Sequence, residues 1–198
     1  MSIDQNSHLS ETWREVPPQH PFGLQTLPFG SFSAHHLPGP RVGIRLGDAV
    51  LDLTAASHLL GPRYARMFVN GSLDRFLAAG PDAWSYVRGA VTDWFRNPSF
   101  HSSIDPLMVS ISNISPRLPF TVADYVDFYA SEHHATNLGK LFRPGQPPLT
   151  ENWKQLPVGY HGRAGTVVVS DTPIVRPSGL RRVGFIRREH VRSGGITG

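Results

Sequence analysis

The sequence predicts a mainly β protein with some α-helix, arranged as two consecutive domains. Gly contributes 19 and Pro 18 of the 198 residues, and with the many Val, Thr and Phe they favour short strands and irregular connections over long helices. The hydrophobic content of 39% is enough to build a core. Residues 97–119 are rich in Ser, Pro and Asn and lack a sustained period, which is typical of a connection between domains.

The amino-terminal residues predict a polar lead followed by a small β unit. Residues 1–20 are polar and close on two prolines, so we expect a disordered or extended lead there. Residues 24–33 alternate around turn residues, and residues 41–53 predict two strands joined by Gly47 and Asp48. These strands are the β part of the first domain.

Two helices complete this first domain, which we expect over residues 21–118. Ser72 can cap a helix over residues 73–79, because its hydroxyl can accept a hydrogen bond from a free backbone amide, and Gly80 can end that helix in the left-handed conformation. A second helix is expected to start at Pro81. Its apolar side chains recur at helical spacing, which predicts core packing rather than a cofactor site: Trp84, Val87, Val91, Trp94 and Phe95.

The second domain is expected over residues 119–179. Residues 165–170 and 172–177 predict two strands around a short Ser-Asp turn, and the β signal fades after Gly179. Residues 180–198 then form a basic tail.

Charge and composition exclude several classes of protein. The isoelectric point is about 9.8, but residues 181–198 hold five Arg against one Glu, whereas the first 180 residues balance at 14 basic and 14 acidic side chains. A nucleic-acid site needs that charge across a folded face, with aromatic platforms between the cations. The sequence therefore argues against a nucleic-acid partner.

The chain contains no cysteine, which excludes disulfides, thiolate metal sites and a cysteine nucleophile. No basic segment followed by an apolar run stands near the amino terminus, and no stretch has the apolar length of a membrane helix. We expect a soluble cytoplasmic protein with no membrane partner.

The chemistry of the chain is concentrated between residues 124 and 163. Asp127 is the hard oxygen donor that Ca²⁺ and Mg²⁺ prefer, although a lone Asp is more often a turn or capping carboxylate. His133 and His134 are adjacent, and a histidine within reach of a water molecule can take its proton near neutral pH. In an extended chain these two side chains point to opposite sides, so only one of them can face a given pocket.

Three further side chains suit an anionic substrate. Arg143 has the forked donor geometry that matches a carboxylate. Tyr129 and Tyr160 each offer a hydroxyl to a carboxylate or enolate oxygen, with packing at the edge of a core as the alternative.

Several segments of the chain resemble the fumarylacetoacetase family in order and spacing. They run from about Pro21 to Gly179 and comprise residues 27–30, 40–44, 124–129, 134–137, 156–163 and 176–179. The resemblance implies an SH3-like small barrel followed by a mixed β-sandwich roll, active as a homodimer. It also implies hydrolysis of a carbon–carbon bond in fumarylacetoacetate, a diketo acid, to fumarate and acetoacetate in the last step of tyrosine and phenylalanine breakdown, with Ca²⁺ or Mg²⁺.

Carried over residue by residue, the resemblance assigns a role to five side chains. Asp127 becomes a metal ligand, and His134 becomes the base that activates water. Tyr129, Arg143 and Tyr160 become contacts to the substrate. Asp124, His161 and Arg163 belong to the same motifs and are expected to support them.

Past Gly179 the sequence departs from the family, which continues through a Glu-x-Glu pair, a further Asp, and Gln, Lys and Glu residues. Residues 180–198 supply none of those groups. We therefore expect an incomplete catalytic domain that binds metal weakly and has little hydrolase activity alone. Two alternatives stay open: a non-catalytic fragment that pairs with a full-length subunit, and a peptide-binding module built on the SH3-like unit.

Overall fold

The computed structural model describes residues 12–175, 178–183 and 187–192. The chain forms two compact units, residues 1–168 and residues 169–198.

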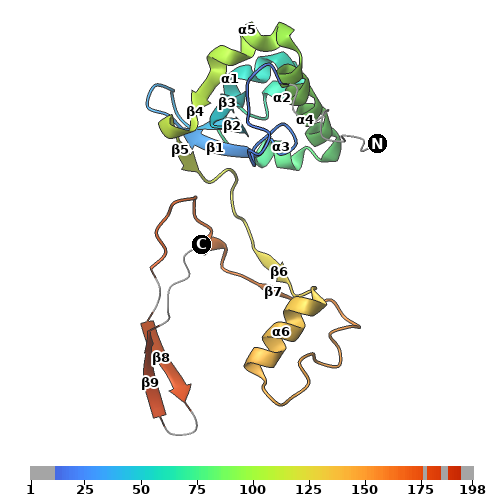
Figure 1. Cartoon of the computed structure of the whole chain (residues 1–198), viewed down its shortest axis with the longest axis vertical. Helices are drawn as coiled ribbons and strands as arrows, with labels where there is room; N and C mark the ends of the chain where they lie inside the picture. Colours follow the sequence, from blue (N-terminus) through green and yellow to red (C-terminus); the bar gives the residue numbers. More distant parts are fainter. Residues whose placement is uncertain (1–11, 176–177, 184–186, 193–198) are drawn as a thin grey trace, which may run out of the picture. The chain divides into compact units, whose positions relative to one another are not determined.

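A curled five-stranded antiparallel sheet dominates the first unit (Figure 1). Its order is β4-β3-β2-β1-β5. The predicted hairpin is confirmed, because β2 and β3 pair with Leu46 opposite Ala49, and Gly47 takes the positive φ of 59° that this tight turn requires. The strands are β1 (Phe29–Ser33), β2 (Arg41–Leu46), β3 (Ala49–Asp52), β4 (Met108–Ser110) and β5 (Ser115–Arg117).

The two predicted helices are confirmed as α3 (Asp74–Ala78) and α4 (Pro81–Arg96). The Ser72 hydroxyl accepts a hydrogen bond from the Asp74 amide at 3.1 Å, and Gly80 has a φ of 83°. Shorter helical segments complete this part of the chain: α1 (Leu53–Ala56), η1 (Ser57–Leu60), α2 (Pro62–Ala65), η2 (Pro98–Phe100), α5 (His101–Ile104), η3 (Asp105–Leu107) and η4 (Ile111–Asn113).

Helix α4 packs its apolar side chains against the sheet. Val87, Val91 and Phe95 are fully buried with Ile44 and Leu46 of β2 in one cluster. The prediction was wrong for Trp84, which is 40% exposed. Its indole N–H donates to the backbone carbonyl oxygen of Phe76 at 2.7 Å, so its polar end is held at the rim of the core.

The segment predicted as a connection between domains belongs to the sheet instead. Within residues 97–119, β4 pairs with β3 and β5 pairs with β1. Pro116 of β5 stands opposite Phe32 of β1, at the edge of the sheet where a proline costs no ladder hydrogen bond. The strands are three residues long, too short to give a pattern that sequence reading detects.

The described part of the predicted lead, residues 12–20, is packed on the first domain and is not a free segment. The Trp13 amide donates to the Phe95 carbonyl oxygen at 3.1 Å, and its indole N–H donates to the Trp94 carbonyl oxygen at 2.6 Å. Arg14 forms an ion pair with Asp105 at 2.9 Å. The remainder of that lead, residues 1–11, lies outside the described residues.

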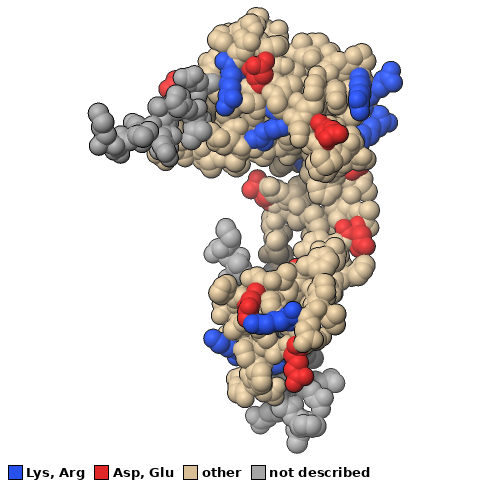
Figure 2. Space-filling view, turned by 90° about the vertical axis from the view of Figure 1, so that its right-hand side faces the viewer, with Lys and Arg blue, Asp and Glu red and all other residues tan. Residues whose placement is uncertain are grey.

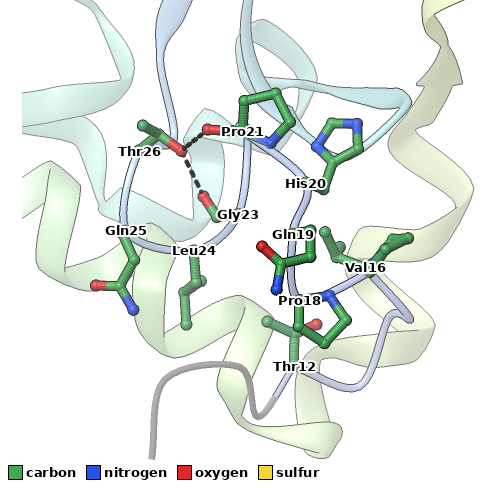
Figure 3. Close-up of a pocket in the computed structure, with 11 residues that line it drawn as sticks. Thr12, Val16, Pro18, Gln19, His20, Pro21, Gly23, Leu24, Gln25 and Thr26 are labelled. Atoms are coloured by element: carbon green, nitrogen blue, oxygen red, sulfur yellow. Dashed lines mark hydrogen bonds between the residues drawn. The ribbon is translucent and has the colours of Figure 1, made fainter. Parts of the chain in front are cut away.

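Residues 12–26 also enclose a cavity of about 420 Å³ (Figure 3). Its walls include Pro18, Pro21 and Leu24, and the Thr26 hydroxyl donates to the Pro21 carbonyl oxygen at 2.8 Å across the loop. The guanidinium of Arg88 holds this loop by donating to backbone carbonyl oxygens of residues 24–27.

Residues 120–168 carry two short strands, β6 (Val126–Phe128) and β7 (Gly159–His161), the helix α6 (Glu132–Phe142) and the short η5 (Ala164–Thr166). The strand predicted over residues 165–170 was wrong, and within residues 167–175 the structure has no strand. A run of β-branched residues forms a strand only where a neighbouring segment accepts and donates its backbone hydrogen bonds. Residues 176–177 of the second predicted strand lie outside the described residues.

The unit of residues 169–198 contains an antiparallel hairpin of β8 (Ser178–Val183) and β9 (Arg187–Arg192). This corrects the expectation that β structure fades after Gly179. The two strands pair with each other, so the hairpin needs only a neighbouring segment of the chain.

Candidate functional site

The pairing of β6 with β7 places Asp127 directly opposite Tyr160. Residues opposite each other on paired strands carry their side chains on the same face. The Tyr160 hydroxyl donates to Asp127 Oδ2 at 2.6 Å. The predicted metal ligand Asp127 is therefore hydrogen-bonded to the predicted substrate contact Tyr160.

Helix α6 positions His134. The Ser131 hydroxyl caps this helix by accepting a hydrogen bond from the His134 amide at 3.4 Å. Both His133 and His134 lie in the first turn of the helix, so the expectation of an extended histidine pair was wrong. Of the two, His134 lines the cavity described below, one helical turn before Leu138.

Tyr129 is held at its backbone and at its hydroxyl. Its amide donates to the Val158 carbonyl oxygen at 2.7 Å, and its carbonyl oxygen accepts the indole N–H of Trp153 at 3.0 Å. Its hydroxyl donates to the carbonyl oxygen of Ala135 in α6 at 2.9 Å. The hydroxyl proton is thus engaged within the protein, and the oxygen keeps its capacity to accept.

Arg143 follows the last residue of α6 and is half-buried. Its Nη2 donates to the Pro148 carbonyl oxygen at 2.6 Å. Its Nε is buried and has no hydrogen-bond partner among the described residues. Gly139 allows this arrangement, because a Cβ there would lie 1.9 Å from the Pro148 carbonyl oxygen.

A cavity of about 480 Å³ brings the five predicted site residues together. Its volume is in the range of pockets that hold small molecules. Sequence reasoning found its polar residues and missed its apolar walls, for which the sequence carries no distinct signal. The lining residues are Asp127, Tyr129, His134, Arg143 and Tyr160 with Phe128, Leu138, Gly139, Phe142 and Val158.

The expected supporting residues lie at the end of the two strands. Asp124 Oδ1 lies 3.3 Å from His161 Nδ1, and the Gly162 amide donates to the Tyr125 carbonyl oxygen at 2.9 Å. These contacts extend the pairing of β6 with β7 beyond its last residue. Arg163 contributes its carbonyl oxygen to Thr166 and is not among the residues that line the cavity.

Electrostatics couple the two residues that face each other across the strands. The hydrogen bond to Asp127, with the negative charge of that carboxylate, raises the pKa of Tyr160 above its ordinary 10.0. The direction follows because phenol ionisation removes the donated proton and places a second anion beside the first.

The cavity offers oxygen atoms, which are the ligands that a hard cation prefers. Asp127 is the carboxylate among the lining residues, and the tyrosines Tyr129 and Tyr160 accompany it. Within residues 12–175, no three or more His, Cys, Asp and Glu side chains gather closely enough to hold a metal ion. Ca²⁺ takes six to eight oxygens, so the described side chains account for part of such a shell.

Two surface features bear on partners. Positive and negative side chains are interleaved on the face shown in Figure 2. Most of the exposed large hydrophobic side chains of the described residues lie after residue 117 and include Phe128, Leu141, Phe142, Leu156 and Tyr160. None of the helices in the described parts of the chain has the length and apolar character needed to cross a membrane.

Residues 25–119 match a protein family described as fumarylacetoacetase N-terminal. The chain is also similar to fumarylacetoacetase of Mus musculus, with 39% identity over 170 residues that cover 81% of this chain and 41% of the relative. The Homo sapiens enzyme is 40% identical over 167 residues, covering 80% and 40%. The Oryza sativa subsp. japonica enzyme is 39% identical over 184 residues, covering 83% and 42%. The chain therefore spans about two-fifths of the length of these relatives.

Proposed function

We propose that the chain carries part of a hydrolase active site, because it is similar to fumarylacetoacetase and residues 25–119 match the family described as fumarylacetoacetase N-terminal. The proposed substrate is the diketo acid 4-fumarylacetoacetate, cleaved to fumarate and acetoacetate. The single observation that supports this site is the cavity lined by Asp127, Tyr129, His134, Arg143 and Tyr160.

His134 is the proposed general base. His134 is exposed in the first turn of α6, where water reaches it, and the hydrogen bond from its amide to the Ser131 hydroxyl fixes the backbone that carries it. A water molecule gives one proton to the imidazole while its oxygen bonds to the substrate carbonyl carbon. The neighbouring carbon–carbon bond then breaks, its electron pair leaves with the acetoacetate fragment, and a proton is returned to that carbon.

Arg143 and the two tyrosines are the proposed substrate contacts. Arg143 lines the cavity, and its Nε–H is a buried donor without a hydrogen-bond partner among the described residues, which a substrate carboxylate that reached it would satisfy. Tyr160 can exchange its hydrogen bond with Asp127 for one to the substrate. Tyr129, whose proton is held by Ala135, offers its oxygen as an acceptor and its ring as a wall.

Asp127 is the proposed ligand of a divalent cation, Ca²⁺ or Mg²⁺. Its carboxylate has the hard oxygens that these ions prefer, and one of them, Oδ2, accepts the Tyr160 hydroxyl. When bound, such an ion polarises the substrate oxygens. Asp127 alone supplies a small part of the shell, so we propose weak binding to this chain.

Binding of fumarate, one proposed product, tests the site. We expect saturable binding to the chain by calorimetry, weakened about tenfold or more in Arg143→Gln, because a hydrogen bond to a charged group contributes about 1.5–3 kcal/mol. Arg163→Gln is the matched control, since Arg163 does not line the cavity. Equal affinity in all three proteins would refute the assignment of Arg143.

A second candidate function is a non-catalytic subunit that pairs with a full-length fumarylacetoacetase chain. Several large apolar side chains between residues 118 and 160 are exposed, and exposed apolar side chains are the material of protein interfaces when they gather on one surface. Co-purification of the tagged chain with the Mus musculus enzyme tests this, and a Leu141→Glu, Phe142→Glu double variant should lose the association.

The relationship also supports the remaining proposals about organisation. We propose an SH3-like first domain over residues 21–118, the start of a β-sandwich roll over residues 119–179, and a distinct tail over residues 180–198. A homodimer in the cytoplasm, acting on a small diketo acid, is proposed on the same ground.

A further inference from the structure

Three aromatic side chains contact one another in sequence, and two of them, Tyr129 and His134, line the cavity. The rings of Trp153 and Tyr129 meet edge to face, with centroids 6.5 Å apart and an interplanar angle of 89°. The rings of Tyr129 and His134 meet in the same manner at 6.1 Å and 74°. Edge-to-face contacts of this kind orient rings relative to one another.

Tyr129 is the middle member, and it is fixed from both sides. Trp153 donates its indole N–H to the Tyr129 carbonyl oxygen, while the Tyr129 hydroxyl donates to Ala135 in the helix that carries His134. The ring of Tyr129 therefore spans from the Trp153 loop to helix α6 and cannot turn away without breaking one of these contacts.

An ion pair joins the same two segments a second time. Lys154 Nζ lies 2.7 Å from Oε1 of Glu132, the first residue of α6. Both side chains are more than half exposed, so this contact contributes little stability by itself. The ion pair matters for where it lies, because it holds Lys154, the residue after Trp153, next to the first turn of α6, which contains His134.

The imidazole of His134 depends on this packing for its orientation. Among the described residues its ring makes no hydrogen bond, and the hydrogen bond recorded for His134 is made by its backbone amide. A ring without a hydrogen-bond partner rotates freely about its side-chain torsions unless a neighbour limits it. The Tyr129 ring is that neighbour.

We propose that Trp153 is a positioning residue for His134 and acts through the Tyr129 ring. The proposal rests on the proposed role of His134 as a base, because orientation matters only if the imidazole must meet a water molecule at a fixed place. Trp153 lies outside the residues that line the cavity, so we assign it a positioning role and no contact with the substrate.

The nuclear magnetic resonance signals of the His134 imidazole test the proposal directly. They are identified as the histidine signals lost in His134→Gln. An aromatic ring next to the imidazole displaces these signals, so we expect Trp153→Phe to move them toward the positions of exposed histidines such as His133. Trp84→Phe is the matched control, because Trp84 also donates its indole N–H to a backbone carbonyl oxygen, in the first domain.

Unchanged His134 signals in a folded Trp153→Phe protein would overturn the proposal. If that variant does not fold, cross-relaxation between ring protons is measured in the unmodified chain. We expect it between Tyr129 and His134 and between Trp153 and Tyr129, and its absence would refute the arrangement. These measurements need no substrate. A failure of fumarate binding with the ring signals as expected would therefore count against the proposed function, and it would leave in place the orientation of the His134 imidazole by Trp153 and Tyr129.

Discussion

Asp127 and Tyr160 face each other across β6 and β7, and the phenol oxygen lies 2.6 Å from Asp127 Oδ2. The contact joins two motifs that are 33 residues apart in the sequence. The Tyr160 hydroxyl and a bound cation would compete for Asp127 Oδ2, because the oxygen that accepts the phenol proton is one that a cation would use.

The ionisation of Tyr160 reports this contact. We expect its pKa to lie above the ordinary 10.0 in the native chain and to fall toward that value in Asp127→Asn, because the substitution removes the negative charge. The phenol signals, assigned by their loss in Tyr160→Phe, follow the titration. Asp124→Asn is the control, and an equal fall in that variant would contradict the assignment.

The raised pKa of Tyr160 also makes the stability of the folded protein depend on pH. A raised pKa in the folded state means that Tyr160 contributes stability below the unfolded value of about 10.0, and that this contribution is lost as the pH rises through the folded pKa. The phenol is exposed, so the effect on the free energy of unfolding is small.

A second pH effect is expected at Asp74. The Thr121 amide donates to this carboxylate at 2.8 Å and the Thr121 hydroxyl at 2.9 Å, and the two hydrogen bonds lower the pKa of Asp74 below 3.8. Its stabilising contribution is therefore present above pH 3.8 and is lost as the pH falls through the folded pKa. We expect Asp74→Asn to accelerate hydrogen exchange at the Thr121 amide near pH 6.

Asp93→Asn is the matched control for this substitution, because Asp93 is also exposed on a helix of the first domain and makes no described side-chain hydrogen bond. Exchange at Thr121 that is equally fast in both variants, or unchanged in Asp74→Asn, would contradict the contact.

Gly139 is expected to tolerate no side chain. A Cβ would lie 1.9 Å from the Pro148 carbonyl oxygen, so Gly139→Ala must push the loop of residues 144–149 away from α6 and break the bond between Arg143 and Pro148. Overpacking of this kind costs about 1–3 kcal/mol. We expect a lower midpoint of urea unfolding and weaker fumarate binding.

Gly89→Ala provides the contrast. Gly89 is exposed within α4, and its Cβ would meet nothing within 4 Å. Replacing a helical glycine by alanine stabilises by about 0.5–1 kcal/mol. A loss of stability in Gly89→Ala equal to that in Gly139→Ala would show that the contact with Pro148 is not the cause.

Local signals made part of the fold predictable from the sequence. The turn at Gly47 and the helix stop at Gly80 depend on a few neighbouring residues and are found where they were expected, and the Ser72 hydroxyl accepts from the Asp74 amide, one residue before the N-cap Leu73 of α3. The strands β4 and β5 were not predictable, because they are three residues long and pair with segments far away in the sequence. Their pairing is decided by the assembled sheet.

The candidate site also has a part that the sequence predicts and a part that depends on the assembled structure. Asp127, His134 and Arg143 carry chemistry that can be recognised in the sequence, and the structure brings them to one cavity. The engagement of the Tyr129 hydroxyl with Ala135 and the support from Trp153 depend on the three-dimensional path of residues 143–158. No periodicity or spacing in the sequence encodes that path.

Calorimetric titration of Ca²⁺ into the chain and into its Asp127→Asn and Asp124→Asn variants tests the central claim, that this cavity is part of a metal-assisted hydrolytic site. We predict weak binding, with a dissociation constant of about 10⁻⁴ M or higher, retained in Asp124→Asn and lost in Asp127→Asn. Heats of titration that are the same in all three proteins would contradict the assignment of Asp127 and with it the proposed metal site.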